Sequence, residues 1–140
     1  MKIKRIEHVG VVVRDVDASR KLWEDCFGIK LGGVEHTPGR PIKLALYPVG
    51  ESMVELLAGI EPDSKFAKMC DDGKAGINHI CFEVENIDEA LAELKAKGVP
   101  LIDQQPRIGH AGFRIAYLDP KGTEGCLIEL AEAPKEHAHP

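Results

Sequence analysis

The chain has 140 residues, of which 44% are hydrophobic and 29% are charged, and its formal net charge is −5. This length fits one domain or two very small modules that share a core. The charges are mixed along the chain, which argues against a nucleic-acid partner, because phosphate binding needs clustered Lys and Arg side chains. No apolar run approaches the roughly 20 residues of a membrane-spanning helix, so no membrane partner is expected.

The expected location is the cytoplasm. The first residues, Met1 to Ile6, are charged and lack the apolar segment of a secretory signal. The four cysteines form no C-x-x-C pair, which fits reduced and mostly buried thiols in a reducing compartment.

The sequence repeats itself once. Residues 6–13 (Ile-Glu-His-Val-Gly-Val-Val-Val) match residues 77–84 (Ile-Asn-His-Ile-Cys-Phe-Glu-Val), so that His8 corresponds to His79. The closing segments Val-Glu55-Leu and Ile-Glu129-Leu also correspond. Because a repeat of this length is one supersecondary unit, the chain is expected to contain two similar modules.

Each module is predicted to run strand, helix, strand, strand, strand. The strand segments are rich in Val, Ile and Leu and are bounded by Gly, Pro or Asp. We expect strands near residues 5–13, 30–36, 42–48 and 52–58 in the first module, and near 77–84, 100–105, 113–118 and 126–132 in the second.

Helices are predicted near residues 17–27 and 88–97. Asp17 and Asp88 are the expected N-caps, and Gly28 and Gly98 stand where a glycine would end each helix. A third, short helix is expected around Ser64–Cys70.

The predicted fold class is α+β, with two tandem βαβββ modules that form a curved mixed sheet around a metal cavity. Residues 1–58 are the first module and residues 77–133 the second. Residues 59–76 are a linker with a short helix, and residues 134–140 are expected to be a disordered tail.

Strand alternation places one His and one Glu of each module among apolar residues. His8 and His79 lie on the first strands, and Glu55 and Glu129 on the last strands. An unpaired buried carboxylate is costly, whereas two imidazoles and two carboxylates suit one divalent ion such as Zn, Co, Ni, Mn or Fe(II). The competing interpretation is a pair of buried His–Glu hydrogen bonds without a metal.

A second group of candidates lies in the loop Arg107-Ile-Gly109-His110-Ala-Gly112-Phe-Arg114. The loop carries two glycines, two cations and an imidazole, and its glycines allow close backbone approach to a ligand; a mobile surface turn is the alternative. His36 and Lys43 could also face the cavity, but alternation alone does not decide this.

The chain resembles the vicinal-oxygen-chelate (glyoxalase/bleomycin resistance/dioxygenase) superfamily and, within it, the methylmalonyl-CoA epimerase family. The resemblance spans roughly residues 3–133. It depends on Glu7-His-Val-Gly, Val54-Glu-Leu-Leu, Gly76-Ile-Asn-His-Ile-Cys-Phe-Glu-Val, and the long segment from Ile108 to Leu130.

This resemblance implies a metal-dependent isomerase that interconverts (R)- and (S)-methylmalonyl-CoA through a metal-stabilised enolate. It implies His8, Glu55, His79 and Glu129 as ligands of one divalent ion, which is cobalt by family preference, with Zn, Ni or Mn possible. Glu129 is also the implied base, and a homodimer and an acyl-CoA substrate are expected. Gly109, His110, Gly112 and Arg114 are the expected substrate-binding residues.

The chain departs from the family pattern at two places. It has Asp119 where the family usually has His, and it has no acid on the third strand, where Lys43 lies nearest the second base. Lys43 is therefore the proposed second catalytic group, with Glu35 or His36 as alternatives.

Other activities of the same superfamily are open. Glyoxalase I (lactoylglutathione lyase) uses the same four-ligand pattern, but the link from Pro120 to Gly125 has the longer epimerase-like form. A metal-free small-molecule binding protein should lack the His/Glu set. A ring-cleaving iron dioxygenase needs only two His and one carboxylate and is usually longer.

Overall fold

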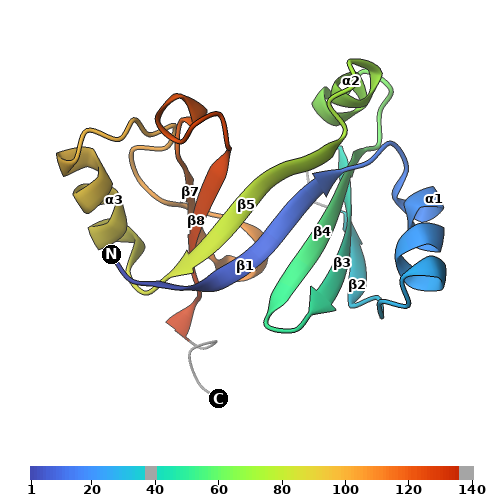
Figure 1. Ribbon diagram of the computed structural model, residues 1–140, viewed down its shortest axis with the longest axis horizontal. Coiled ribbons are helices and arrows are strands. Elements are labelled where there is room, and N and C mark those ends of the chain that lie inside the picture. The colour runs from blue at the N-terminus through green and yellow to red at the C-terminus, as the bar shows by residue number, and fades with distance from the viewer. Residues whose placement is uncertain (37–40, 136–140) are drawn as a thin grey trace. The chain divides into compact units, whose positions relative to one another are not determined.

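The computed structural model describes residues 1–36 and 41–135, and the chain divides into two compact units (Figure 1). The N-terminal unit is His8–Asn78. The C-terminal unit consists of Met1–Glu7 together with the chain from His79 onward. Two strands, β1 (Ile3–Val12) and β5 (Gly76–Val84), therefore contribute residues to both units.

The N-terminal unit has the strand order β2-β3-β4-β1. Strand β1 runs parallel to β4, and the other neighbours are antiparallel. After β1 come two helical segments that follow each other without a break, the α-helix α1 (Val16–Arg20) and the π-helix η1 (Lys21–Cys26). The remaining elements are β2 (Gly33–His36), β3 (Ile42–Val49), β4 (Ser52–Gly59) and the helix α2 (Lys65–Asp71).

The two faces of this sheet carry different residues. On one face, which we call the helix face, Val16 and Trp23 pack against Ala45, Tyr47 and Leu56. On the opposite face, which we call the site face, Val12, Leu44 and Leu57 form a second apolar cluster with side chains of α2. Because side chains alternate along a strand, the strand register assigns every residue to one face or the other.

The C-terminal unit repeats this plan with the strand order β5-β8-β7-β6. Strand β5 runs parallel to β8, and the other neighbours are antiparallel. Helix α3 (Ile87–Ala96) packs on the helix face through Ile87, Ala90 and Leu91. The other strands are β6 (Arg107–Ile108), β7 (Arg114–Tyr117) and β8 (Ile128–Glu132). Short 3₁₀ turns are η2 (His110–Gly112) and η3 (Pro120–Gly122).

Several element boundaries differ from the sequence prediction. Asp15 and Asn86 cap the two helices, not Asp17 and Asp88, which lie in the first turns. A strand over 100–105 was wrong: only Leu101 forms an isolated bridge, and the strand is the two-residue β6. The short helix after Ser64 is confirmed, since Ser64 caps α2. Most of the predicted disordered tail, residues 136–140, lies outside the described residues.

The predicted α+β class with mixed pairing is confirmed, because both units combine one parallel strand pair with antiparallel ones. Gly28 and Gly98 adopt positive φ angles of 71° and 79°, as expected for glycines that follow a helix. Within residues 1–36 and 41–135, the helices are all too short or too polar to span a bilayer.

Candidate metal centre and the face around it

In the C-terminal unit, the predicted ligands His79 and Glu129 lie together on the site face. Nε2 of His79 is 3.2 Å from Oε1 of Glu129, and the two residues are only 4% and 5% exposed. The parallel register of β5 and β8 explains this proximity. It places Cys81 opposite Glu129, and His79 lies two residues before Cys81 on the same face of the strand. Both residues belong to a group that could hold a metal ion.

In the N-terminal unit, His8 and Glu55 form the corresponding pair. Nε2 of His8 is 3.9 Å from Oε2 of Glu55, and both side chains are largely buried. The parallel register sets Gly10 opposite Glu55, just as it sets Cys81 opposite Glu129. The duplicated sequence therefore produces the same His–Glu juxtaposition on the site face of each unit.

The chemistry and spacing of each pair fit a metal centre. Ligand atoms that share an ion at about 2.0–2.2 Å and at angles of about 90–110° lie roughly 3.0–3.5 Å apart. The His79–Glu129 separation of 3.2 Å falls in this range, and the His8–Glu55 separation of 3.9 Å requires a wider angle. Imidazole and carboxylate donors together suit Zn, Co, Ni, Mn or Fe(II).

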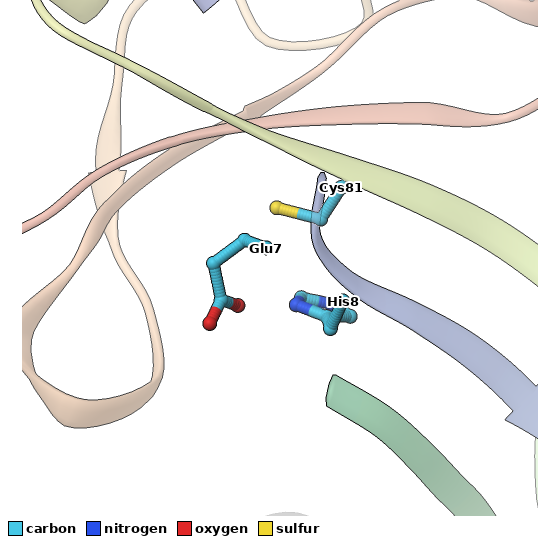
Figure 2. Close-up of side chains that lie close together, drawn as sticks. All are labelled: Glu7, His8 and Cys81. Atoms are coloured by element: carbon cyan, nitrogen blue, oxygen red, sulfur yellow. The ribbon is translucent and has the colours of Figure 1, made fainter. Parts of the chain in front are cut away.

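Two further side chains of metal-ligating type lie in the C-terminal unit. The carboxylate of Glu7 and the thiol of Cys81 are within 4.8 Å of one another, and Figure 2 shows both, with His8 next to Glu7 along the chain. Cys81 is fully buried and lies opposite Glu129 in the strand register. A thiol thus lies beside the His79–Glu129 pair, which the sequence prediction did not include.

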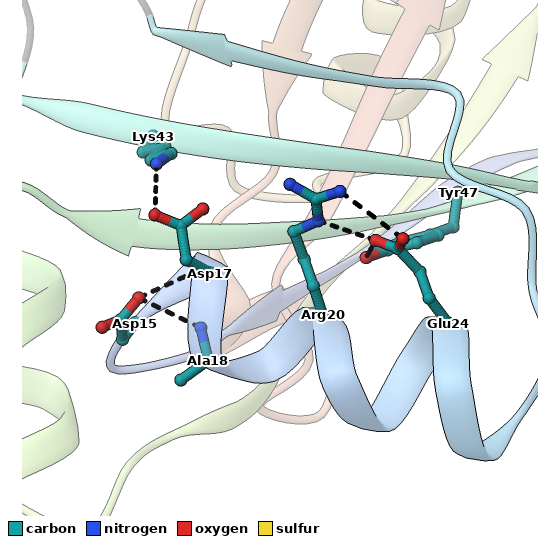
Figure 3. A network of polar contacts seen from close by, with 7 residues as sticks. All are labelled: Asp15, Asp17, Ala18, Arg20, Glu24, Lys43 and Tyr47. Carbon is teal, nitrogen blue, oxygen red and sulfur yellow. Dashed lines mark hydrogen bonds and ion pairs between the residues drawn. The ribbon is translucent and has the colours of Figure 1, made fainter.

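Lys43, the proposed second catalytic group, lies on the helix face. Its register partner is Ala58, which belongs to the apolar cluster under α1. Nζ of Lys43 donates a hydrogen bond of 2.8 Å to Oδ2 of Asp17 on that helix, as Figure 3 shows. This bond holds the pKa of Asp17 below its ordinary value. Lys43 and Glu55 therefore point to opposite sides of the sheet, and the structure does not bring Lys43 to the site.

Arg114, a predicted substrate-binding residue, shows the same disposition in the C-terminal unit. Its two terminal nitrogens donate to both carboxylate oxygens of Asp88 on α3, at 2.8 and 3.1 Å. It pairs in register with Glu132, whose carboxylate caps the first turn of α3 at Ile87. Arg114 is thus engaged on the helix face, away from Glu129.

The rest of the predicted substrate loop forms the turn between β6 and β7. The N–H of Gly109 donates to the carbonyl of Phe113, and the N–H of Phe113 donates to the carbonyl of His110. Ala111 and Gly112 adopt positive φ angles of 56° and 79°. His110, Ala111 and Gly112 are exposed, so the turn is accessible to a ligand.

Glu35 is the acid that shares the site face with Glu55. The β2–β3 register pairs Glu35 with Leu44, and Leu44 in turn pairs with Leu57 of the site-face cluster. His36, the other alternative, pairs with Lys43 and so lies on the helix face. The sequence did not decide among these three residues, because neighbours along a strand point to opposite faces.

Arg107 is a cation on the site face; the sequence placed it in the candidate loop but chose Arg114 as the substrate-binding cation. Arg107 pairs with Ile115, which pairs with Ala131 on the Glu129 side of the sheet. Its guanidinium lies over the ring of Tyr117, 5.6 Å from the ring centroid. Tyr117 is opposite Glu129 in register and meets the ring of His79 edge-on. Arg107 lies on the site face and Arg114 on the helix face, and this difference is visible only from the register of the two-residue strand β6.

These features define a duplicated βαβββ protein with a histidine–carboxylate pair in each unit. Residues 7–117 match the family model of the Glyoxalase/Bleomycin resistance protein/Dioxygenase superfamily. The chain belongs to this superfamily, and its relatives include methylmalonyl-CoA epimerases, which confirms the resemblance seen in the sequence.

Among curated proteins, the chain is 31% identical to the mitochondrial methylmalonyl-CoA epimerase of Bos taurus, over 92% of this chain and 74% of that one. It is 31% identical to an ethylmalonyl-CoA/methylmalonyl-CoA epimerase of Cereibacter sphaeroides, over 93% and 98%. Among solved structures, methylmalonyl-CoA epimerase from Mycobacterium tuberculosis has a TM-score of 0.85 and 32% identity, with 98% and 93% covered.

A lactoylglutathione lyase of Schizosaccharomyces pombe is more distant. It is 27% identical over 71% of this chain and 39% of its own length. The comparisons thus support an epimerase-type enzyme more strongly than a glyoxalase.

Proposed function

We propose that the protein interconverts the two epimers of methylmalonyl-CoA. The observation that carries this proposal is the His–Glu pair on the site face of each unit, at 3.2 and 3.9 Å. It is supported by relatives that are named methylmalonyl-CoA epimerases and by a structural neighbour, 28% identical with a TM-score of 0.84, that was solved with methylmalonyl-CoA.

His8, Glu55, His79 and Glu129 would together hold one divalent ion. The proposal that the two pairs share this ion is based on the duplication, because each unit alone offers only two ligands of this set. A bound divalent ion supplies Lewis-acid stabilisation of the negative charge that develops when the carbon next to the thioester loses its proton.

Glu129 is the proposed base for one face of the substrate. Its carboxylate lies next to the imidazole of His79 in a largely buried environment, which shields the carboxylate from bulk water. Glu129 would accept the proton from the carbon between the thioester and the carboxylate, or return it.

Epimerisation also needs a proton donor on the opposite face of that carbon. We propose Glu35 for this role instead of Lys43, since Glu35 lies on the site face, whereas Lys43 is bonded to Asp17 on the helix face. Glu35 is half-buried on that face.

The turn at Gly109–Gly112 is proposed to contact the acyl group through backbone N–H groups other than that of Gly109, which donates to Phe113. A homodimer and a cytoplasmic location remain predictions from the sequence.

Deuterium exchange tests the proposal. The cobalt-loaded protein is incubated with (S)-methylmalonyl-CoA in D₂O, and label at the epimerisable carbon is measured by mass spectrometry. We expect rapid exchange that Glu129→Gln abolishes. Exchange no faster than in the protein-free control would refute the function, and turnover of methylglyoxal with glutathione would instead establish the glyoxalase reaction.

A further inference from the structure

Arg107 lies on the site face of the C-terminal unit, close to Tyr117 and on the same face as Glu129. Its side chain is half exposed, and it leaves β6 on the same side of the sheet as Glu129. Between the two lies Tyr117, which is opposite Glu129 in register and beneath the Arg107 guanidinium.

Two contacts orient the guanidinium of Arg107. Nε of Arg107 donates to Oδ1 of Asp103 at 3.4 Å, and the other oxygen of Asp103 accepts a 2.8 Å bond from the N–H of Tyr117. The ring of Tyr117 supports the guanidinium from below. Since one carboxylate engages Arg107 through Nε, its terminal nitrogens form the edge of the fork that can meet a second anion.

Arg114 of the same unit is an arginine whose guanidinium is bound within the protein. Both of its terminal nitrogens bind the two oxygens of Asp88, which satisfies its fork within the protein. Arg107 and Arg114 thus differ in face and in the part of the guanidinium that is engaged.

The sequence duplication identifies the residue of the N-terminal unit that corresponds to Arg107. The ion pairs Lys43–Asp17 and Arg114–Asp88 each join residues 26 positions apart, so Lys43 corresponds to Arg114 and the next residues, Leu44 and Ile115, correspond as well. The register partners of Leu44 and Ile115 are Glu35 and Arg107. At one equivalent position of the repeat, one unit therefore carries an acid and the other a cation.

We infer that Arg107 binds an anionic group of the substrate and sets the specificity of the enzyme for charged thioesters. This inference builds on the proposed function. The anionic group is one with two oxygens that accept two parallel hydrogen bonds from a guanidinium. It is supplied either by the carboxylate of the malonyl group or by a phosphate of coenzyme A.

Calorimetric titration distinguishes these two sources. Three compounds are bound to the cobalt-loaded protein: methylmalonyl-CoA, methylmalonyl-pantetheine, which keeps the carboxylate and lacks phosphates, and coenzyme A, which keeps the phosphates and lacks the carboxylate. We expect Arg107→Gln to weaken methylmalonyl-CoA binding by about 10- to 100-fold. Arg107→Lys should lose less, and Arg114→Gln should bind as the unaltered protein does.

A loss confined to methylmalonyl-pantetheine and methylmalonyl-CoA assigns Arg107 to the carboxylate. A loss confined to coenzyme A and methylmalonyl-CoA assigns it to a phosphate. Unchanged affinity of Arg107→Gln and Arg107→Lys for all three compounds overturns the inference, as does failure of the unaltered protein to bind any of them. Because binding does not depend on turnover, an absent exchange reaction would refute the proposed function, while the effect of Arg107→Gln on affinity would still decide the role of Arg107.

Discussion

Lys43 donates a 2.8 Å hydrogen bond to Asp17, and this bond turns the lysine toward helix α1. The carboxylate of Glu35 leaves the neighbouring strand on the opposite face, which it shares with Leu44 and Glu55. The choice of the second base therefore depends on which face of one sheet a residue occupies.

The first prediction compares these two residues. Glu35→Gln should lower the rate of epimerisation of methylmalonyl-CoA by at least about 100-fold, because an amide cannot transfer the proton on the opposite face of the carbon. Lys43→Met should retain the rate to within about twofold, since the lysine acts on the helix face. Conversion of one epimer into the other at saturating substrate measures both. Loss of epimerisation in Lys43→Met alone, with a normal circular dichroism spectrum, would return the role to the lysine.

The sequence predicted the His–Glu pairs because the duplication reports them directly. His8 and His79 occupy the same place in the repeat, and so do Glu55 and Glu129. In the structure, each His lies close to the Glu on the last strand of its unit. No comparable signal exists for a single residue such as Lys43. An error of one position in a strand moves a side chain to the other face.

Helix starts and short strands show the same limit. Asp15 and Asp17 are both good N-caps by composition, and only the backbone of the first turn selects Asp15. Strand β6 has two residues, which is too short for alternation to be visible, so Arg107 could not be assigned to the site face. The apolar run near residue 101 was a better strand by composition but forms a single bridge.

The second prediction separates metal binding from proton transfer at Glu129. Glu129→Gln keeps an oxygen donor of nearly the same shape but loses the basic carboxylate. We expect it to retain cobalt and to lose at least about 100-fold in exchange rate. Elemental analysis after gel filtration and the exchange assay are run on the same sample. If exchange persists with the metal in place, Glu129 is a ligand only.

The third prediction concerns the sharing of one ion by both units. The unaltered protein should bind one cobalt ion per chain, and His8→Ala and His79→Ala should each fall below about one tenth of an ion. His36→Ala is the control, because His36 lies on the helix face. Two ions per chain, or an ion retained when one histidine is replaced, would show that the pairs act independently.

The fourth prediction follows from the buried phenol of Tyr47. Burial, followed by its 2.7 Å hydrogen bond to Glu24, raises the pKa of Tyr47 to about 12 (Figure 3). An unfolded tyrosine ionises near pH 10. Between these values the unfolded chain has lost the proton that the folded chain keeps, so stability must fall as the pH rises.

Urea unfolding at several pH values measures this effect. The free energy of unfolding should be independent of the Tyr47 proton below about pH 9 and should fall by roughly 1.4 kcal/mol per pH unit between about 10 and 12. Tyr47→Phe should lack this component of the slope, although it also loses the bond to Glu24. Parallel pH profiles for the two proteins would mean that Tyr47 ionises normally in the folded state.

The fifth prediction concerns Ala111, whose φ of 56° is a conformation that costs a residue with a Cβ roughly 1–2 kcal/mol. Glycine removes this cost but adds freedom to the unfolded chain, which offsets about 0.4–1 kcal/mol. Ala111→Gly should therefore stabilise the protein by about 0.5–1 kcal/mol in urea unfolding. The matched control is Ala92→Gly in the middle of α3, where the same substitution should destabilise by about 1 kcal/mol. A loss of stability in both variants would show that the turn between β6 and β7 does not hold Ala111 in the left-handed region.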